Sequence, residues 1–183
     1  MELDQLVKQA QKQNDEAFYE LISIHKNQLY KVAYSYFKNE QDALDALQEV
    51  TYRAYFKIKK VQEPQYFSTW LIRIMLNYCT DEMNRRNKQE MKMIERDKAA
   101  TMDEHLLAEL EFDDLIDSLD PKYQQIIKLK YVNDLTISQI SEVVQYPEGT
   151  VKTWLYKSLK LIRKQLESEG GISHVRARRE IAK

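Results

Sequence analysis

Residues that make tight turns are scarce in this chain. Only 3 glycines and 3 prolines occur among 183 residues, and neither type occurs before Pro64 or between Pro64 and Pro121. Hairpins and sharp turns depend on these residues, so little in the sequence favours a β-sheet. The composition therefore predicts an all-α fold.

Cysteine and histidine are almost as scarce. Cys79 is the single cysteine, which excludes an intrachain disulfide or a cysteine zinc site. His25, His105 and His174 are too far apart for a metal-ligand motif, and no phosphate-binding glycine loop or nucleophile motif appears. We therefore expect no metal, no cofactor and no catalytic residues, and we expect that the protein is not an enzyme.

Long apolar runs are also missing. No segment is long enough to cross a bilayer, and no basic segment followed by an apolar one resembles a signal peptide. The expected location is cytoplasmic. The 28 basic and 29 acidic side chains give a net charge of −1, so any basic surface for nucleic acid must be local.

Apolar residues recur at steps of three and four, which is typical of amphipathic helices. Such stripes occupy residues 3 to about 62, and a long helix is predicted from about Tyr66 toward Lys88, after a break at Pro64, with Leu71, Ile74, Met75 and Tyr78 on its buried face. Asp120 followed by Pro121 predicts the start of a further helix, as an N-cap and a first helical residue. We expect two small helical domains joined by a linker. The expected boundaries are 1–89 for the first domain, 90–111 for the linker, 112–169 for the second domain and 170–183 for a basic, mobile tail.

Residues 134 to 163 have the pattern of a helix-turn-helix. Thr136 and Gln139 form a capping box at the start of its first helix. A break at Gln145 and Tyr146 is followed by Pro147, a residue that suits the first position of a helix. The second helix is then expected to run to about Leu166.

The second helix of this pair has one apolar and one cationic face. Val151, Leu155, either Leu159 or Ser158, and Ile162 recur at helical spacing and are predicted to face inward. Between residues 150 and 165 there are five Lys or Arg and no Asp or Glu. A solvated basic face is the simple interpretation, but the capped first helix and the short turn favour a helix that enters a DNA major groove.

Three segments of this region resemble region 4 of extracytoplasmic-function (ECF, group 4) sigma factors. They are residues 118–127 (SLDPKYQQII), 136–141 (TISQIS) and 148–153 (EGTVKT). The N-terminal half resembles region 2 of the same family. Residues 42–50 (DALDALQEV) are similar to the family's DAEDLVQEV, and residues 67–77 (FSTWLIRIMLN), with Asp81 and Arg85–Arg86, are similar to its Trp-Leu…Asn…Asp…Arg pattern.

The resemblance implies a subunit that directs promoter-specific initiation by core RNA polymerase, in a stress or envelope response. Region 2 would bind the β′ clamp helices and recognise and melt the minus-10 element, while region 4 would hold the minus-35 element near the β flap. Expected partners are core RNA polymerase, promoter DNA and an anti-sigma factor, often a membrane-anchored one. The chain itself is not expected to be a membrane protein.

Site residues carried over from the family fall into three sets. The polymerase-binding set is Asp42, Asp45, Gln48, Glu49 and Tyr52. The minus-10 and melting set is Tyr66, Phe67, Trp70, Arg73, Asn77, Asp81, Asn84, Arg85 and Arg86. The minus-35 set is Gly149, Thr150, Lys152, Thr153, Tyr156, Lys157 and Lys160.

Several of these residues also have a purely structural interpretation. Trp70, Tyr66 and Phe67 offer rings on which an extruded base could stack, but aromatics at the start of an apolar helix are commonly core residues. Asn77, Asp81 and Asn84 share one helix face, where amide and carboxylate groups could read base edges. The polar residues around Asp42 could equally form an ordinary solvated face.

The sequence departs from the family pattern at four positions. Leu44 replaces an acid in the docking motif, and Gln145 stands where glycine is frequent, so a left-handed backbone there would cost about 1 kcal/mol. Trp154 and Leu159 stand at positions that are often Arg in the family, which lowers the positive charge of the basic face. An acidic run from residue 103 to residue 120 is interpreted either as solvated surface or as a mimic of a nucleic-acid backbone.

Two other classes of protein remain possible from the sequence. An autonomous helix-turn-helix regulator would dimerise and bind a palindromic operator without polymerase. An interaction protein could keep the fold and lack promoter binding, in which case region 4 substitutions would leave its function intact.

Overall fold

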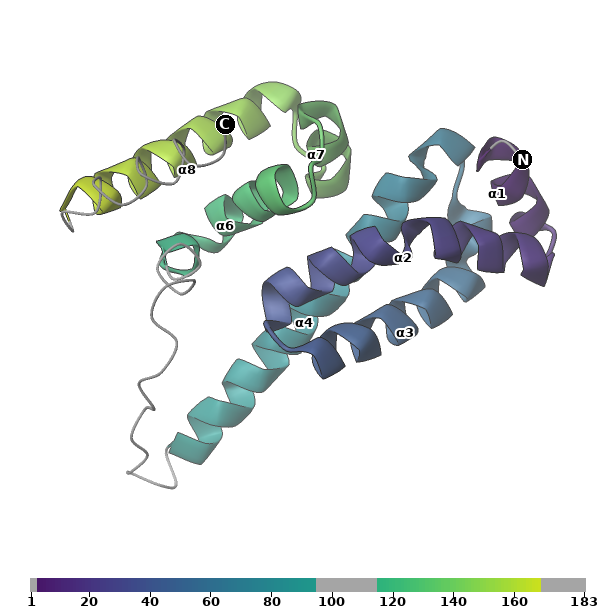
Figure 1. Cartoon of the computed structure of the whole chain (residues 1–183), viewed down its shortest axis with the longest axis horizontal. Coiled ribbons are helices and arrows are strands. Elements are labelled where there is room, and N and C mark those ends of the chain that lie inside the picture. Colours follow the sequence, from purple (N-terminus) through teal and green to yellow (C-terminus); the bar gives the residue numbers. More distant parts are fainter. Residues whose placement is uncertain (1–2, 95–114, 169–183) are drawn as a thin grey trace, which may run out of the picture.

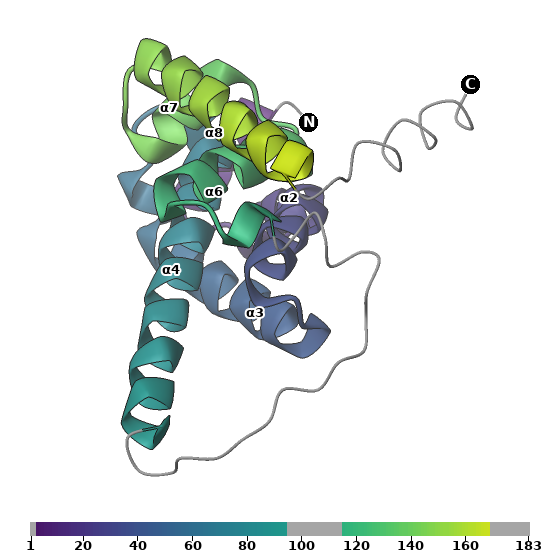
Figure 2. The ribbon, with the colours of Figure 1, turned by 90° about the vertical axis from the view of Figure 1, so that its left-hand side faces the viewer.

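The computed structural model describes residues 3–94 and 115–168, which form helices with no β-strand among them. The first domain consists of α1 (Leu3–Gln11), α2 (Asp15–Phe37), α3 (Glu40–Lys57) and α4 (Phe67–Ile94), with two short 3-10 turns, η1 (Ile58–Lys60) and η2 (Pro64–Tyr66). Figures 1 and 2 show α2 and α3 lying beside α4, whose last turns project beyond them.

Side-chain caps fix the joints between the first helices. The Asn14 Oδ1 accepts a hydrogen bond from the Ala17 N–H at the start of α2. At its other end, Lys38 adopts a left-handed conformation with a φ of 53°, which reverses the chain within two residues. The Asn39 Oδ1 then accepts from the Asp42 N–H and starts α3. This tight connection holds α2 and α3 antiparallel.

The long helix predicted after Pro64 is present and longer than expected. It begins at Phe67 and continues to Ile94, so the segment expected as a linker from residue 90 begins as helix. Leu71 and Met75 are fully buried, and Tyr78 is half-buried, as their spacing predicts. The remainder of the expected linker from residue 95, and the basic tail 170–183, lie outside the described residues.

The second domain contains α6 (Pro121–Ile127), a π-helical turn η3 (Lys128–Val132), α7 (Ile137–Val144) and α8 (Glu148–Ser168). The Asp120 side chain caps the Lys122 N–H, and Pro121 occupies the first turn, as the sequence predicts. The π-helical turn is not predicted by the sequence pattern. It leads into a short irregular segment, in which Asp134 has a left-handed φ of 54°, and this segment ends at the cap of α7.

The helix-turn-helix forms as predicted. Thr136 and Gln139 make the reciprocal capping box. α7 ends at Gln145, whose φ of 59° and ψ of 40° are left-handed, in the place where the family often has glycine. Pro147 precedes α8, and its carbonyl accepts the Thr150 N–H. In α8, Ser158 rather than Leu159 faces the interior, because Ser158 is fully buried and Leu159 is exposed.

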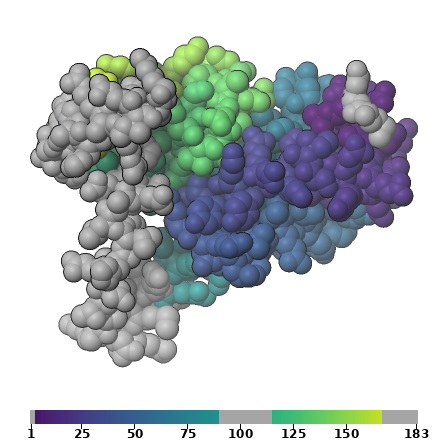
Figure 3. Space-filling model, viewed as in Figure 1, coloured from purple at the N-terminus to yellow at the C-terminus, as the bar shows by residue number. Residues whose placement is uncertain are grey.

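The two domains pack directly on one another. One continuous core joins the apolar residues of α1–α4 to a set from the second domain: Ile126, Leu129, Leu135, Ile140, Val143 and Val151. A smaller cluster lies wholly within the second domain and contains Ile116, Leu119, Ile127 and Ile162. In Figure 3 the green surface of the second domain lies against the purple and blue surface of the first.

Cys79 is part of the shared core. The thiol is fully buried, and burial raises its pKa to about 12, so it is held in the neutral form. Its neighbours include Tyr36, and burial raises the pKa of that phenol as well. No helix within residues 3–94 and 115–168 combines the length and the apolar character that a bilayer span requires.

Candidate functional site

Four of the five predicted polymerase-binding residues share one face of α3. Asp45, Gln48, Glu49 and Tyr52 line a shallow pocket together with Tyr78 of α4. The Arg53 Nε donates to the Glu49 Oε1 at 2.7 Å, and the Arg53 guanidinium lies 5.0 Å from the centre of the Tyr78 ring. We call Asp45, Gln48, Glu49 and Tyr52 the docking face. Its role in binding polymerase stays a prediction.

Exposed aromatic rings continue this face toward the end of α3. Tyr52 and Phe56 are 62% and 66% exposed, and their ring centroids lie 4.8 Å apart. Tyr55 contacts the Phe56 ring and donates its hydroxyl to the Asp15 Oδ1 at 2.7 Å. Large exposed rings of this kind mark interaction surfaces. Tyr55 and Phe56 are absent from the sequence-based set, although their three- and four-residue spacing from Tyr52 was the available signal.

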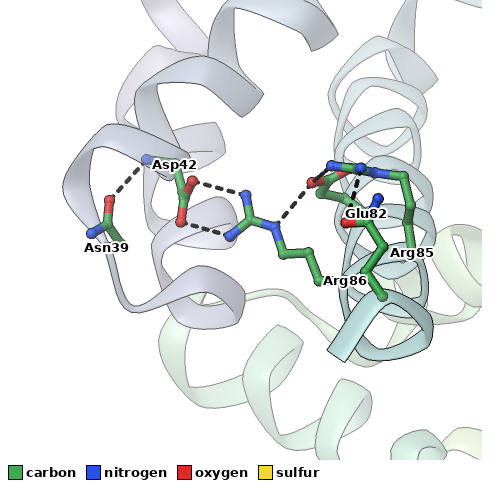
Figure 4. Close-up of polar contacts among 6 residues, drawn as sticks. Asn39, Asp42, Glu82, Arg85 and Arg86 are labelled. Atoms are coloured by element: carbon green, nitrogen blue, oxygen red, sulfur yellow. Dashed lines mark hydrogen bonds and ion pairs between the residues drawn. The ribbon is translucent and has the colours of Figure 1, made fainter. Parts of the chain in front are cut away.

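Asp42, in the first turn of α3, points toward Arg86 of α4 (Figure 4). Its two carboxylate oxygens accept from the Nη1 and Nη2 of Arg86, each at 2.8 Å (Figure 4). The same arginine donates through its Nε to the Glu82 Oε1 at 2.9 Å. The structure thus pairs a predicted polymerase contact with a predicted DNA contact, on helices that meet at the edge of the first domain.

Glu82 is the centre of this polar group. Arg85 donates to the Glu82 carboxylate through Nε at 2.8 Å and through Nη2 at 2.6 Å, and Arg85 and Arg86 lie on opposite sides of that carboxylate (Figure 4). The hydrogen bonds from Arg85 and Arg86 hold the pKa of Glu82 at about 2. The hydrogen bonds from Arg86 likewise keep the pKa of Asp42 below its usual value. All four side chains are therefore charged at neutral pH.

The predicted melting residues divide into exposed and buried ones. Tyr66 is exposed, Trp70 is half-buried, and both line a cleft with Arg73. Phe67 departs from the prediction because it is fully buried, where its ring packs edge-on against His25 at 5.3 Å. Phe67 is a core residue of this fold and offers no surface for a base. Trp70 contacts Phe67 and packs on the core with part of its ring.

Asn77, Asp81 and Asn84 are brought together, as their spacing predicts. With Arg73 they line one wall of a cleft of about 1140 Å³. The opposite wall belongs to the second domain and includes Lys122, Tyr146 and Trp154. We call Tyr66, Trp70, Arg73, Asn77, Asp81 and Asn84 the minus-10 face, and its DNA contacts stay predictions.

Polar contacts join the two domains beside these clefts. The Thr69 hydroxyl donates to the Glu142 Oε2 of α7 at 3.1 Å. Lys128, in the π-helical turn, is only 6% exposed. Its Nζ donates to the Asp117 Oδ1 at 3.0 Å and lies 4.9 Å from the centre of the Tyr36 ring. A buried ammonium therefore has both an acid and an aromatic face as partners.

Six of the seven predicted minus-35 residues on α8 are open to solvent, and Thr150 is half-buried. Lys152, Thr153, Tyr156, Lys157 and Lys160 are all exposed, and we call these five the minus-35 face. Lys152 lies 3.4 Å from Glu148. In the described part of the chain, Lys157 and Lys160 have no acid within ion-pair distance. A Cβ added at Gly149 would meet open space, so the first turn of α8 leaves room beside its backbone.

The departure from the family pattern at Trp154 has a local structural explanation. Trp154 is half-buried, and its ring lies 4.7 Å from that of Tyr146, edge to face. This contact packs Tyr146, in the turn between α7 and α8, against the second turn of α8. Among the residues described, no group of three or more His, Cys, Asp or Glu side chains is arranged to hold a metal ion.

Two family models match this chain. Residues 21–89 match sigma-70 region 2, and residues 109–162 match sigma-70, region 4. The ECF RNA polymerase sigma factor SigW of Bacillus subtilis is 30% identical over 184 residues, covering 91% of this chain and 97% of that protein. The chain belongs to the ECF group of the sigma-70 family. SigV of the same organism is also 30% identical, over 81% of this chain and 90% of its own length.

Solved structures agree on the fold of this ECF sigma factor. CnrH, in complex with the cytosolic domain of CnrY, aligns with a TM-score of 0.69 and 20% identity, over 91% of this chain and 99% of that one. The sigma factor RpoE of Bartonella quintana, in complex with the anti-sigma factor NepR, gives 0.64 and 17% identity, over 82% and 96%. Sigma factors are a family of non-enzymatic transcription initiation factors, and this chain belongs to that family.

Proposed function

We propose that this ECF sigma factor binds core RNA polymerase through α3 and directs initiation at a specific set of promoters. In this proposal the minus-10 face on α4 recognises and melts one element, and the minus-35 face on α8 holds the other. The observation that carries the proposal is the exposed minus-35 face, a cationic surface on a chain whose net charge is −1, where Lys152 is paired with Glu148 and, among the described residues, Lys157 and Lys160 have no acid at ion-pair distance. Such local charge suits phosphates and base edges in a major groove.

The docking face suits a protein partner. Exposed rings of Tyr52 and Phe56 provide apolar contact, and Asp45, Gln48 and Glu49 provide a polar rim beside them. Interfaces between proteins combine an apolar centre with a polar rim in this way. We assign this face to the β′ clamp helices of core polymerase, and the second domain to the neighbourhood of the β flap.

The proposed function requires the two domains to separate. Asn77, Asp81 and Asn84 face the second domain across the cleft, and Thr69 at the start of α4 is bonded to Glu142 of α7. In this proposal the second domain blocks a DNA duplex from that wall of the cleft. Promoter binding by the free chain is therefore weak, and binding of core polymerase supplies the free energy that parts the domains.

An anti-sigma factor is the proposed regulator. Two of the similar solved structures are complexes. RpoE is bound to the anti-sigma factor NepR, and CnrH is bound to the cytosolic domain of CnrY. The proposed partner of this chain is an anti-sigma factor, membrane-anchored in an envelope response, while the sigma factor acts in the cytoplasm without a cofactor or catalytic residues. The proposed domains are 1–89, the linker 90–111, 112–169 and the tail 170–183.

A titration onto bacterial core RNA polymerase tests this function. The purified chain should bind core enzyme with a one-to-one stoichiometry, and the assembled holoenzyme should start transcription from genomic fragments that share two spaced elements. The double variant Tyr52→Ala, Phe56→Ala is the matched control for docking, and it should bind core enzyme more weakly. Failure to bind core polymerase, with duplex DNA bound by a dimer of the free chain, would identify an autonomous regulator instead.

A further inference from the structure

The Asp42–Arg86 pair links the two helices that carry the docking face and the minus-10 face. Asp42 lies in the first turn of α3, where Asn39 holds its backbone N–H, and Arg86 lies in the second half of α4. The two residues are 44 positions apart in the sequence and share two hydrogen bonds of 2.8 Å. A bidentate arginine–carboxylate pair of this kind fixes orientation as well as distance.

Further contacts hold the Arg86 guanidinium in place. Its Nε donates to Glu82 at 2.9 Å, and its Cζ atom lies 5.1 Å from the centre of the Phe37 ring at the end of α2. The group thus meets α2, α3 and α4 at once. Three of the five N–H groups of the Arg86 guanidinium therefore have acceptors within the protein, which leaves two for any other partner.

The neighbouring residues are held differently. Asp45, one turn later on α3, accepts from Gln41 of its own helix. Arg85, next to Arg86 on α4, donates to Glu82 and Gln89 of its own helix. Within the described residues, Asp42 and Arg86 form the ion pair that connects α3 to α4. Adjacent residues of the same types therefore serve as internal comparisons.

We infer that Asp42 and Arg86 are positioning residues that couple polymerase docking to promoter recognition, and that neither acts mainly as a direct contact. The inference rests on the proposed function, since it concerns the two surfaces assigned there. The pair fixes the start of α3 against the second half of α4. Loss of either partner releases both helices, so each substitution disturbs the docking face and the minus-10 face together.

Four matched variants test this coupling: Asp42→Asn, Asp45→Asn, Arg85→Gln and Arg86→Gln. For each, the affinity for core polymerase is measured first, and promoter opening is then measured at saturating core enzyme. Asp42→Asn and Arg86→Gln should each weaken both steps by about threefold to tenfold, a range set by the partial exposure of the pair. Asp45→Asn should weaken only polymerase binding, and Arg85→Gln only the promoter step.

The double variant sharpens the result. Asp42→Asn combined with Arg86→Gln should be no worse than either single change, because each one already removes the same pair. Arg86→Lys should retain only part of the polymerase binding and promoter opening, since an ammonium lacks the planar fork of a guanidinium. If Asp42→Asn impairs only polymerase binding and Arg86→Gln impairs only promoter opening, the coupling is refuted while the proposed function stands.

A measurement on the free chain separates the two proposals completely. Amide hydrogen exchange in the first turns of α3 should become faster in Arg86→Gln, although the substitution lies on α4, and should stay unchanged in Arg85→Gln. Unchanged exchange in both variants would overturn the positioning role even if polymerase binds normally. Faster exchange in Arg86→Gln alone would support it even if core polymerase does not bind.

Discussion

The two candidate DNA surfaces hold their positive charges in opposite ways. On α4, Arg85 and Arg86 are committed to Glu82 and Asp42 at 2.6 to 2.9 Å. On α8, the ammonium groups of Lys157 and Lys160 point into solvent with no acid at ion-pair distance among the described residues. The first arrangement fixes side-chain geometry, and the second maximises the local positive field.

This difference separates two contributions to promoter recognition. Free cations attract phosphates at a distance and release counterions, so their contribution falls steeply with salt. Paired cations contribute little long-range field, and their value lies in the geometry that they impose on neighbouring helices. We therefore expect the minus-35 face to supply salt-sensitive affinity, and α4 to supply recognition that depends on orientation.

The largest effect is expected from removing charge on α8. Lys157→Ala and Lys160→Ala together should weaken promoter binding by holoenzyme, by about 1 to 3 kcal/mol for each base that a lysine reads. If the lysines bind phosphates, the slope of log K against log salt should fall by about 0.9 for each one instead. Binding measured at several salt concentrations distinguishes the two cases. Lys31→Ala, an exposed lysine on α2, is the control for net charge.

The second effect concerns the buried cation between the domains. Asp117→Ala leaves the Lys128 ammonium buried without its acid, and should lower the free energy of unfolding by about 1 to 3 kcal/mol. Lys128→Met should cost much less, because the Asp117 carboxylate that remains is half exposed and can be solvated. Urea denaturation of the two variants measures this asymmetry. Equal losses would mean that each variant removes only the ion pair, and that an unpaired ammonium at position 128 carries no extra cost.

The third effect is a pH dependence from Glu82. Its folded pKa of about 2 lies below the unfolded value, so its stabilisation is complete above the unfolded pKa of about 4.5 and is lost as the pH falls toward 2. Glu82→Gln should therefore be less stable at pH 7, by about 1 kcal/mol after solvent screening of the exposed arginines. The two proteins should converge near pH 2. A constant difference across this range would assign the effect to packing.

The smallest effect compares the left-handed residues that end α2 and α7. Lys38 and Gln145 have φ values of 53° and 59°, and a side chain in that region costs free energy that glycine avoids. Lys38→Gly and Gln145→Gly should each raise the unfolding free energy by up to about 1 kcal/mol. Thermal unfolding of each variant tests this. Destabilisation at Gln145 alone would show that its side chain, which lines both inter-domain clefts, contributes more than its backbone costs.

Local signals in the sequence account for most of the fold. The capping box at Thr136, the Asp120 cap before Pro121 and the apolar stripe of α4 predict helix starts and buried faces, and each is confirmed. These features depend on residues within a turn or two of one another. The same is true of Asn77, Asp81 and Asn84, which the spacing of a helix brings onto one wall of a cleft.

Features that depend on distant partners could not be predicted. The π-helical turn at Lys128–Val132 presents Lys128 to Asp117 and Tyr36, and no local pattern indicates it. Phe67 and Tyr66 are neighbours of one chemical type, and Phe67 is buried where the start of α4 packs against His25 of α2 and the shared core. The pairing of Asp42 with Arg86 joins residues that a family comparison assigns to different partners.

The reactivity of Cys79 can report on transient opening of the structure in which the two domains pack together. Thiol reagents attack the thiolate, and Cys79 is fully enclosed and held protonated, so it should resist labelling while the structure is intact. Modification of Cys79 then requires a transient opening of the structure. The rate of modification therefore reports how often such openings occur, without an added probe. Dyes can be attached at new surface cysteines while the native one stays silent, which makes distances between the two domains measurable in solution.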